Sequence, residues 1–361
     1  MSNSKILLSI IIPVYNAEKF IHDCLNSLLN QDISAEEYEI ICVNDGSTDT
    51  SLAILQEYAK NNPNVIVIDK PNEGVSQTRN KGLAASRGEY VWFIDSDDWI
   101  ARNCLGLIQQ QIKKYHPSII QVHYDWIKAE WRVKQCKAAL FNINNVVCSS
   151  PCQEELPFDG AWSSIISKEL LDRYNLSFNE SLHYGEDILF IRDLFDHIRI
   201  ESSFDSNKII HLKNEIFYYY RFHDESACRT SWTTNREKYT EALLRLARIN
   251  KERMLDTTKP DWYREKYTNL YYNRMYNYML YWLPAIDTNL HKILAQLKAE
   301  KLYPIKGISY RDLHLTASQA GTINQLKERI KFAFFKWHCI YPFYYTKMKK
   351  KILNTENKPK Q

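Results

Sequence analysis

Three carboxylates stand together directly after an apolar run of the chain. The stretch YVWFIDSDDW spans residues 90–99 and places Asp95, Asp97 and Asp98 behind apolar and aromatic residues. Three like charges within four residues repel one another, and no cationic residue is adjacent to them in the sequence. On an extended backbone, Asp95 and Asp97 would point to one side and Ser96 to the other. Either this loop is solvated, or a cation from outside the chain belongs there.

A hard divalent cation fits this residue set best. Carboxylates suit Mg²⁺ or Mn²⁺, which keep some water and also bind phosphate oxygens, whereas zinc would favour His or Cys. A calcium loop of the EF-hand kind needs Gly at its sixth and Glu at its twelfth position, which here hold Ile100 and Gly106. Phosphatases of the haloacid dehalogenase type usually have a threonine where this chain has Trp99, and they remain a distant alternative. The carboxylates therefore indicate Mg²⁺ or Mn²⁺ bridging a diphosphate.

The elements that must position these carboxylates alternate between strands and helices. Apolar runs of strand length, without polar alternation, predict buried parallel strands covered on both faces. The predicted strands are 7–12, 39–43, 65–68 and 90–94, with helical spacing at 17–31, 52–58 and 75–84. We therefore expect an α/β protein with a Rossmann-like, mostly parallel sheet.

Polar residues follow each predicted strand, at Tyr15, Asn16, Asp45, Asp69 and Asn72. Ligands of open parallel sheets bind outside the carboxyl ends of the strands, so these residues and the 95–98 loop predict a nucleotide site. Each of these residues could instead have a purely structural role. The stretch NDGSTD suits a turn with helix caps, and Arg79 alone would be an ordinary surface residue.

Successive motifs of the chain resemble those of family 2 glycosyltransferases. The segments are SIIIPVYNAEKFIHDCLNSLLNQ, EIICVNDGSTDTS and NEGVSQTRNKGLAASRGEYVWFIDSDDW, in the same order and at ordinary spacing. The resemblance is dense over about the first hundred residues and thins out towards residue 230. It implies a GT-A fold, a nucleotide-sugar donor and usually inversion at the anomeric carbon.

The resemblance also assigns roles to residues. It implies residues that line a pocket for the nucleotide base, contact uracil or ribose, lie near the diphosphate, and bind the metal ion. The residues concerned are Pro13 and Tyr15 for the base pocket, Asp45 for uracil or ribose, Arg79 near the base or diphosphate, Asp95 and Ser96 for the donor, Asp95 and Asp97 for the metal, and Asp98 for the metal or sugar. The segment YYYRFHDES (218–226) resembles one that closes over the diphosphate, which makes His223 a candidate third metal ligand beside its structural alternative.

An inverting transfer needs a carboxylate that takes the proton of the acceptor hydroxyl. In LHYGEDILF (182–190), Glu186 and Asp187 precede an apolar helix, where acidic residues also favour the helix dipole. The resemblance implies that Asp187 is the base and that Glu186 orients it or the acceptor. One departure from the family is that Trp162 is followed by Ser163 and Ser164, where many relatives carry a lysine two positions on.

Composition favours a protein with differently charged regions. The 361 residues have a net charge of +4 and are 45% hydrophobic. The net charge is +14 from residue 231 onward and −10 over residues 1–230. We expect a nucleotide-sugar-binding half at 1–125, an acceptor-side half at 126–230 and a basic, tyrosine-rich helical region at 231–361.

The chain shows no signal peptide and no apolar stretch of membrane-spanning length, which predicts a cytoplasmic protein. Eight scattered cysteines fit a reducing compartment, and their only close pair, Cys148 and Cys152, lacks the partners of a zinc site. Residues 331–361 contain eight lysines and eight aromatics. This tail predicts either a packed helix or peripheral binding to the inner face of the cytoplasmic membrane.

The function predicted is a metal-dependent, inverting transfer of a hexosyl or N-acetylhexosaminyl group from a UDP-sugar. The acceptor would be a hydroxyl of a growing cell-surface glycan (capsule, lipopolysaccharide or exopolysaccharide) or its lipid-linked precursor. Transfer to a polyprenyl phosphate is one alternative, and a degenerate, membrane-bound scaffold without activity is another. No nucleic acid partner is expected.

Overall fold

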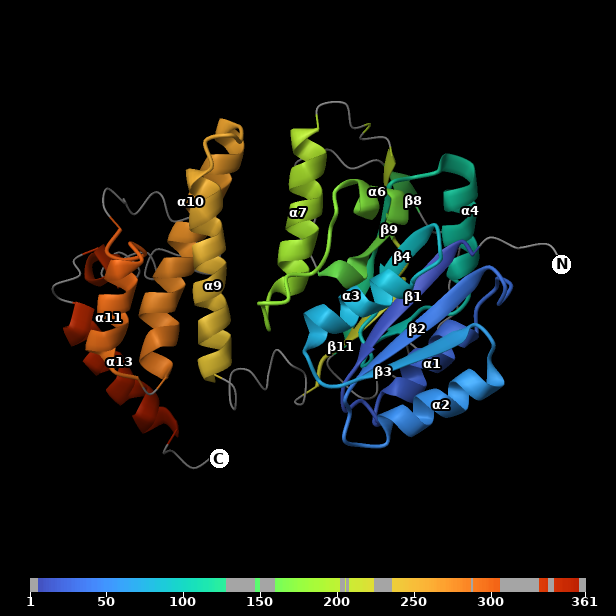
Figure 1. Ribbon diagram of the computed structural model, residues 1–361, viewed down its shortest axis with the longest axis horizontal. Coiled ribbons are helices and arrows are strands. Elements are labelled where there is room, and N and C mark those ends of the chain that lie inside the picture. Colours follow the sequence, from blue (N-terminus) through green and yellow to red (C-terminus); the bar gives the residue numbers. More distant parts are fainter. Residues whose placement is uncertain are drawn as a thin grey trace. The chain divides into compact units, whose positions relative to one another are not determined.

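The chain folds into an α/β unit followed by a helical unit (Figure 1). A computed structural model describes residues 6–127, 147–149, 160–201, 205, 208–223, 236–286, 288–305, 331–336 and 341–356. The two units are Met1–Ser226 and Ala227–Gln361. The close pair of cysteines lies outside the described side chains, whereas Cys24, Cys42 and Cys104 are buried free thiols.

The first unit contains the described strands and six of the helices. The strands are β1 (Leu8–Val14), β2 (Tyr38–Asp45), β3 (Val65–Lys70), β4 (Tyr90–Phe93), β5 (Trp99–Ile100), β6 (Ile119–Val122), β7 (Tyr124–Ile127), β8 (Val147–Ser149), β9 (Ser164–Ser167), β10 (Ile209–Lys213) and β11 (Tyr218–Arg221). The helices are α1 (Ile21–Leu29), α2 (Ser51–Asn61), α3 (Val75–Ala85), α4 (Leu105–Tyr115), α6 (Lys168–Arg173) and α7 (Glu186–Ile200). The four strands and three helices predicted for the first hundred residues are all present.

A mostly parallel sheet forms the centre of this unit. Its strand order is β3-β2-β1-β4-β9-β6-β10-β8. Strands β3, β2, β1 and β4 run parallel to one another, and β6 runs parallel to β10. Strand β9 pairs antiparallel with β4 and β6, and β8 pairs antiparallel with β10. The predicted fold class is confirmed.

Alternate residues of the strands serve two separate cores, because successive side chains point to opposite faces of a sheet. Ile10 and Trp92 pack in one cluster with α1, α2 and α4, whereas Ile11 and Phe93 pack in another with α6 and α7. Helix α3 lies on the second face, where a Cβ on Gly82 would be only 2.4 Å from Ile11. Burial on both faces explains why these strands lack polar alternation.

A small second sheet connects the acidic loop to the end of this unit. Its order is β5-β11-β7, with β11 antiparallel to β5 and parallel to β7. Because β5 directly follows Asp98, this pairing brings residues 95–98 next to β11 and to His223, which follows it.

The second unit is built from long helices that bury tyrosines. Its described helices include α9 (Arg236–Leu255), α10 (Asp261–Asn277), a π-helical turn (Tyr278–Trp282), α11 (Leu290–Ala299) and α13 (Tyr341–Glu356). Tyr341 donates to the carbonyl of Met279, and Tyr344 donates to that of Leu280 at 3.2 Å. These hydroxyls bond carbonyls of the π-helical turn, so buried tyrosines hold α13 on the unit.

This packing corrects part of the interpretation of the tail. The aromatics that continue past Pro342 suggested a membrane surface, but Tyr341, Tyr344 and Tyr345 are buried in the core of the second unit. Only Phe343, 69% exposed, faces solvent among the aromatics of the described part of α13. No helix within the described ranges is both long enough and apolar enough to span a membrane.

Candidate active site at the strand ends

Polar side chains meet where β1, β2 and β3 end. Asn44 donates to the carboxylate of Asp69 at 2.7 Å, across the register that pairs these two residues. The side-chain oxygen of Asn16 accepts from the backbone nitrogen of Thr48 at 2.8 Å. The predicted polar rim therefore exists, because parallel strands end at the same edge of the sheet.

Asp45 shapes the loop that precedes α3. One carboxylate oxygen accepts from the backbone nitrogen of Glu73 at 2.8 Å and from Lys70, and the other accepts from Gly74 at 3.0 Å. Asp45 is 4% exposed, so these bonds hold it at the bottom of the loop. Gly46 allows the backbone after β2 to come close to Asn72 in this loop. Its φ is +65°, and a Cβ there would be 2.7 Å from Asn72 N.

The acidic loop forms a turn, and this corrects the expectation of an extended backbone. The backbone nitrogen of Asp98 donates to the carbonyl of Asp95 at 3.1 Å, and residues 96–97 lie in the turn. The three carboxylates consequently have three different partners instead of two sharing one side. Ser96 lies half-buried in this turn.

Arg79 supplies a cation that sequence neighbours could not reveal. Its guanidinium lies 2.8 Å from Asp95 Oδ1 and 2.7 Å from Glu186 Oε1. Burial alone would lower the pKa of Arg79, but the two carboxylates outweigh burial and raise it. The expectation that only an external cation compensates the 95–98 loop is therefore wrong in part, because α3 brings Arg79 to Asp95.

Asp97 and His223 form the pair that best fits a divalent cation. His223 Nε2 lies 2.8 Å from Asp97 Oδ2, and both side chains are partly exposed. The other ring nitrogen, Nδ1, is buried and has no hydrogen-bond partner. No group of three or more His, Cys, Asp or Glu side chains converges among the described residues. One carboxylate with one imidazole fits an ion that takes its remaining ligands from phosphate and water.

Asp98 differs from its sequence-based interpretation as a metal or sugar ligand. It is 1% exposed, and it bonds the hydroxyl of Tyr218 and, at 2.7 Å, the backbone nitrogen of Arg221. Burial and the charges of the neighbouring aspartates raise the pKa of Asp98 well above its usual range. Both carboxylate oxygens are used, so Asp98 fastens the turn to β11.

Asp187, the predicted base, has a raised pKa. It lies in the first turn of α7, and Oδ1 accepts from the backbone nitrogen of Ile188 at 2.8 Å. Burial, together with the charge of Glu186, raises the pKa of Asp187 to about 7. A base with a pKa near the working pH is both ionised and able to hold a proton.

Gly160 is a feature that sequence reasoning missed. A Cβ at this position would lie 2.6 Å from Asp187 Oδ2 and 2.4 Å from the indole Nε1 of Trp162. Only a residue without a side chain lets the backbone run between these two groups. No local pattern marks Gly160, because its neighbours come from elsewhere in the fold.

The remaining predicted residues have less defined surroundings. Tyr15 is 52% exposed beside the rim, and Pro13 is half-buried in β1. Ser226, at the end of the segment that resembles a diphosphate lid, lies outside the described residues. Trp162 is buried and stacks on Tyr218, with ring centroids 5.0 Å apart.

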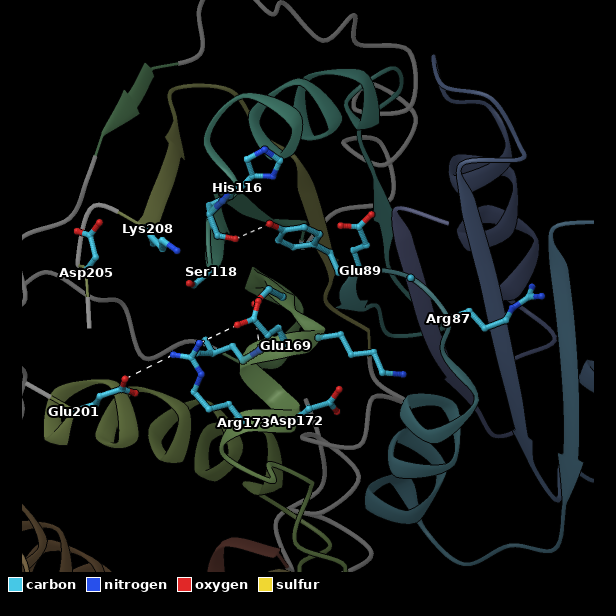
Figure 2. A pocket seen from close by; sticks show the side chains of 16 residues that line it. Arg87, Glu89, His116, Ser118, Glu169, Asp172, Arg173, Glu201, Asp205 and Lys208 are labelled. Carbon is cyan, nitrogen blue, oxygen red and sulfur yellow. Dashed lines mark hydrogen bonds and ion pairs between the residues drawn. The ribbon is translucent and has the colours of Figure 1, made fainter. Parts of the chain in front are cut away.

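A separate cavity of about 650 Å³ lies at the opposite edge of the sheet (Figure 2). Its lining includes Tyr90, at the start of β4, and Ser118 and Lys208, just before β6 and β10. Arg173, also in the lining, pairs with Glu169 at 2.9 Å. The cavity therefore belongs to the amino ends of the strands, away from the acidic centre.

The mostly parallel sheet, with acidic groups at its strand ends, has the arrangement of a GT-A domain. Residues 9–174 match the model of glycosyl transferase family 2, and the chain therefore carries a domain of this family. This match confirms the predicted family for residues 9–174.

Proteins similar to this chain agree with this assignment. The uncharacterized glycosyltransferase EpsJ of Bacillus subtilis is 31% identical over 215 residues, which cover 58% of this chain and 61% of EpsJ. The poly(ribitol-phosphate) beta-N-acetylglucosaminyltransferase TarS of Staphylococcus aureus is 28% identical over 58% of this chain and 35% of TarS. This chain thus matches less than two thirds of the length of either relative.

A solved structure extends the likeness in fold over most of the chain. The crystal structure of S. aureus TarS 1–349 has a TM-score of 0.61 at 21% identity and covers 92% of this chain and 90% of its own. TarS 1–349 has also been solved in complex with UDP and with UDP-GlcNAc.

Proposed function

We propose that this protein is a metal-dependent, inverting glycosyltransferase that moves a sugar from a UDP-sugar to a hydroxyl of a cell-surface glycan or its lipid-linked precursor. The observation that carries the proposal is the double contact of Arg79. One buried guanidinium holds Asp95 of the acidic turn and Glu186, the neighbour of Asp187. The loop proposed for the diphosphate and the carboxylate proposed as base thus belong to one charge network.

The donor proposal rests on the polar rim. Tyr15 and Pro13 would line the base, and Asp45 would contact uracil or ribose through the remaining acceptor capacity of its oxygens. Asp95 and Ser96 would face the ribose and diphosphate. The UDP and UDP-GlcNAc complexes of TarS, a protein of similar fold, support a uridine nucleotide as the carrier.

Asp97 and His223 would hold the divalent cation, Mn²⁺ or Mg²⁺. When bound, such an ion neutralises charge on the diphosphate leaving group. We leave Asp98 out of the ligand set, because its oxygens bond Tyr218 and Arg221.

Asp187 would take the proton of the acceptor hydroxyl as its oxygen attacks the anomeric carbon from the face opposite the diphosphate. Glu186 would not accept this proton, because Arg79 binds its carboxylate at 2.7 Å. Its role would be to fix the start of α7 and to raise the pKa of Asp187 by its charge.

A screen of UDP-sugars for hydrolysis in Mn²⁺ tests the proposal, because glycosyltransferases that lack an acceptor can pass the sugar to water. A UDP-sugar that is hydrolysed identifies donor and enzyme class together. Asp187→Asn should then abolish transfer to hydroxyl acceptors while UDP still binds. Retained transfer by this variant would remove Asp187 as base and favour a polyprenyl phosphate acceptor, which needs none. No hydrolysis and no UDP binding would favour the inactive scaffold.

The names of relatives support a cell-surface acceptor, since they include a poly(ribitol-phosphate) transferase and the minor teichoic acid biosynthesis protein GgaB of B. subtilis. For such an acceptor we propose peripheral contact with the inner face of the membrane through α13. Phe343, Lys347 and Lys350 are exposed and follow the spacing of one helix face.

Two lysines near an anionic leaflet contribute roughly 2 kcal/mol, so this contact would be weak and reversible. Lys347→Glu with Lys350→Glu should reduce sedimentation with anionic liposomes at low salt. The matched control is Lys292→Glu with Lys298→Glu, two exposed lysines of α11 that give the same change of charge. Equal loss in both variants would argue against a specific face, and no loss in either would argue against the contact.

A further inference from the structure

Strands β7 and β11 carry four aromatic residues on one face of the small sheet. The register pairs Tyr124 with Tyr218 and Trp126 with Tyr220. Since side chains alternate along a strand, all four rings share a face. The ring centroids of Trp126 and Tyr220 are 4.6 Å apart, and those of Trp126 and Tyr124 are 6.2 Å apart.

This aromatic face changes from buried to exposed along its length. Tyr218 is fully buried and bonds Asp98, while Tyr124 and Tyr220 are half-buried and Trp126 is 44% exposed. A single exposed aromatic would be ordinary, but Trp126 continues a surface of stacked and tilted rings. We call Tyr124, Trp126 and Tyr220 the aromatic platform.

The aromatic platform leads directly to the proposed base. Trp162 contacts Tyr124 edge-on at 4.5 Å and Tyr220 at 5.7 Å. The same indole borders Gly160, where the absent Cβ leaves Trp162 Nε1 and Asp187 Oδ2 on either side of the backbone. One indole therefore separates the platform from the carboxylate that would accept the acceptor's proton.

We propose that the aromatic platform binds the pyranose ring at the accepting end of the glycan. The C–H face of a pyranose is apolar and flat enough to pack on an aromatic ring, while its hydroxyls stay at the edge and in water. Tyrosine and tryptophan suit such a ligand, because each combines a large apolar face with a polar group. This inference rests on the proposed transfer function and adds the class of acceptor.

The platform would also bind one class of acceptor in preference to another. A ribitol phosphate chain has no ring face, so stacking would favour a ring sugar over an open-chain polyol phosphate. We therefore expect a sugar-terminated acceptor to be used in preference to a ribitol phosphate end.

The test compares Trp126→Ala, Trp126→Phe and the control Tyr115→Ala. Tyr115 is 49% exposed at the end of α4, and the next residue, His116, lines the cavity at the amino ends of the strands. Probe acceptors are p-nitrophenyl β-glucoside, β-galactoside and β-N-acetylglucosaminide, with ribitol 5-phosphate for comparison. Trp126→Ala should raise the KM for the preferred glycoside at least tenfold, which is about 1.4 kcal/mol, and more than it raises the KM for the donor. Trp126→Phe should recover most of this loss, and Tyr115→Ala should leave the KM unchanged.

Binding of the same glycosides is also measured by saturation-transfer NMR, which does not depend on turnover. If no UDP-sugar is hydrolysed but a glycoside binds in a Trp126-dependent manner, the transfer function fails and the platform stands. If hydrolysis occurs but Trp126→Ala changes neither glycoside binding nor acceptor KM, the platform fails and the transfer function stands. Preference for ribitol 5-phosphate, or loss of folding alone in both Trp126 variants, would also overturn the platform.

Discussion

Replacing Asp187 by asparagine should stabilise the folded protein while it removes transfer. Burial and the charge of Glu186 raise the pKa of Asp187 to about 7, well above its ordinary value of 3.8. The folded state therefore holds the proton of Asp187 more tightly than the unfolded state does. As pH rises from about 4 to about 7, the unfolded chain ionises this group freely and the folded chain does so at a cost.

The size of the effect follows from the shift. A rise of about three pKa units corresponds to about 4 kcal/mol, and we take this as an upper limit for a side chain that water still reaches. The asparagine of the Asp187→Asn variant carries no charge at any pH, so the folded variant does not pay the free energy of ionising a buried carboxyl group. Its stability advantage should be below about 1 kcal/mol at pH 4 and should approach its maximum at pH 8.

Urea unfolding of both proteins at pH 4, 6 and 8, in EDTA and without donor, measures this difference. The expected result is a difference in unfolding free energy that grows with pH, with equal m-values. In the wild type, transfer should fall as pH drops below about 7, because the base becomes protonated. A constant difference across this range, or a less stable variant at pH 8, would refute the raised pKa and with it the argument for Asp187 as base.

Three further changes test other parts of the structure. Asp97→Ala should weaken UDP binding in Mn²⁺ and change it little in EDTA, as measured by isothermal titration; equal affinities for the wild type in both buffers would argue against the metal. Gly160→Ala should lower kcat by roughly a hundredfold, because a displacement of about 1 Å of the Asp187 carboxylate has effects of this size; unchanged kcat would mean that the carboxylate moves freely. Tyr341→Phe leaves the carbonyl of Met279 without its hydroxyl donor and should lower the unfolding free energy by about 1–3 kcal/mol, whereas no change would show that water replaces the hydroxyl.

The sequence was sufficient for the first four strands of the sheet and for its polar edge. Strands at 7–12 and 39–43 were visible because burial on both faces demands unbroken apolar runs. The rim followed from topology, since every parallel strand ends at one edge, wherever its residues lie in the chain. These features depend on local pattern and on general rules of sheets.

The partners of the carboxylates could not be found in this way. Arg79 and Glu186 are 107 positions apart, and their contact depends on how α3 and α7 pack on the sheet. The turn at 95–98 is another case, since Asp98 bonds Tyr218 and Arg221 from a strand 120 residues further on. Like charges adjacent in sequence indicated a site but not which carboxylate would be committed to the fold.

The acidic centre also explains why stability and activity should oppose each other here. Arg79 is one cation shared by Asp95 and Glu186, so it offsets the effects of burial and of Glu186 on Asp187 only in part. Burial, together with the charge of Glu186, raises the pKa of Asp187, and the surplus negative charge of this centre would favour binding of a cation with its diphosphate. A fold selected for stability alone would replace one of these carboxylates with a neutral side chain. Their placement at the end of parallel strands and the start of α7 therefore fits the proposed binding of a charged donor better than a role in stabilising the fold.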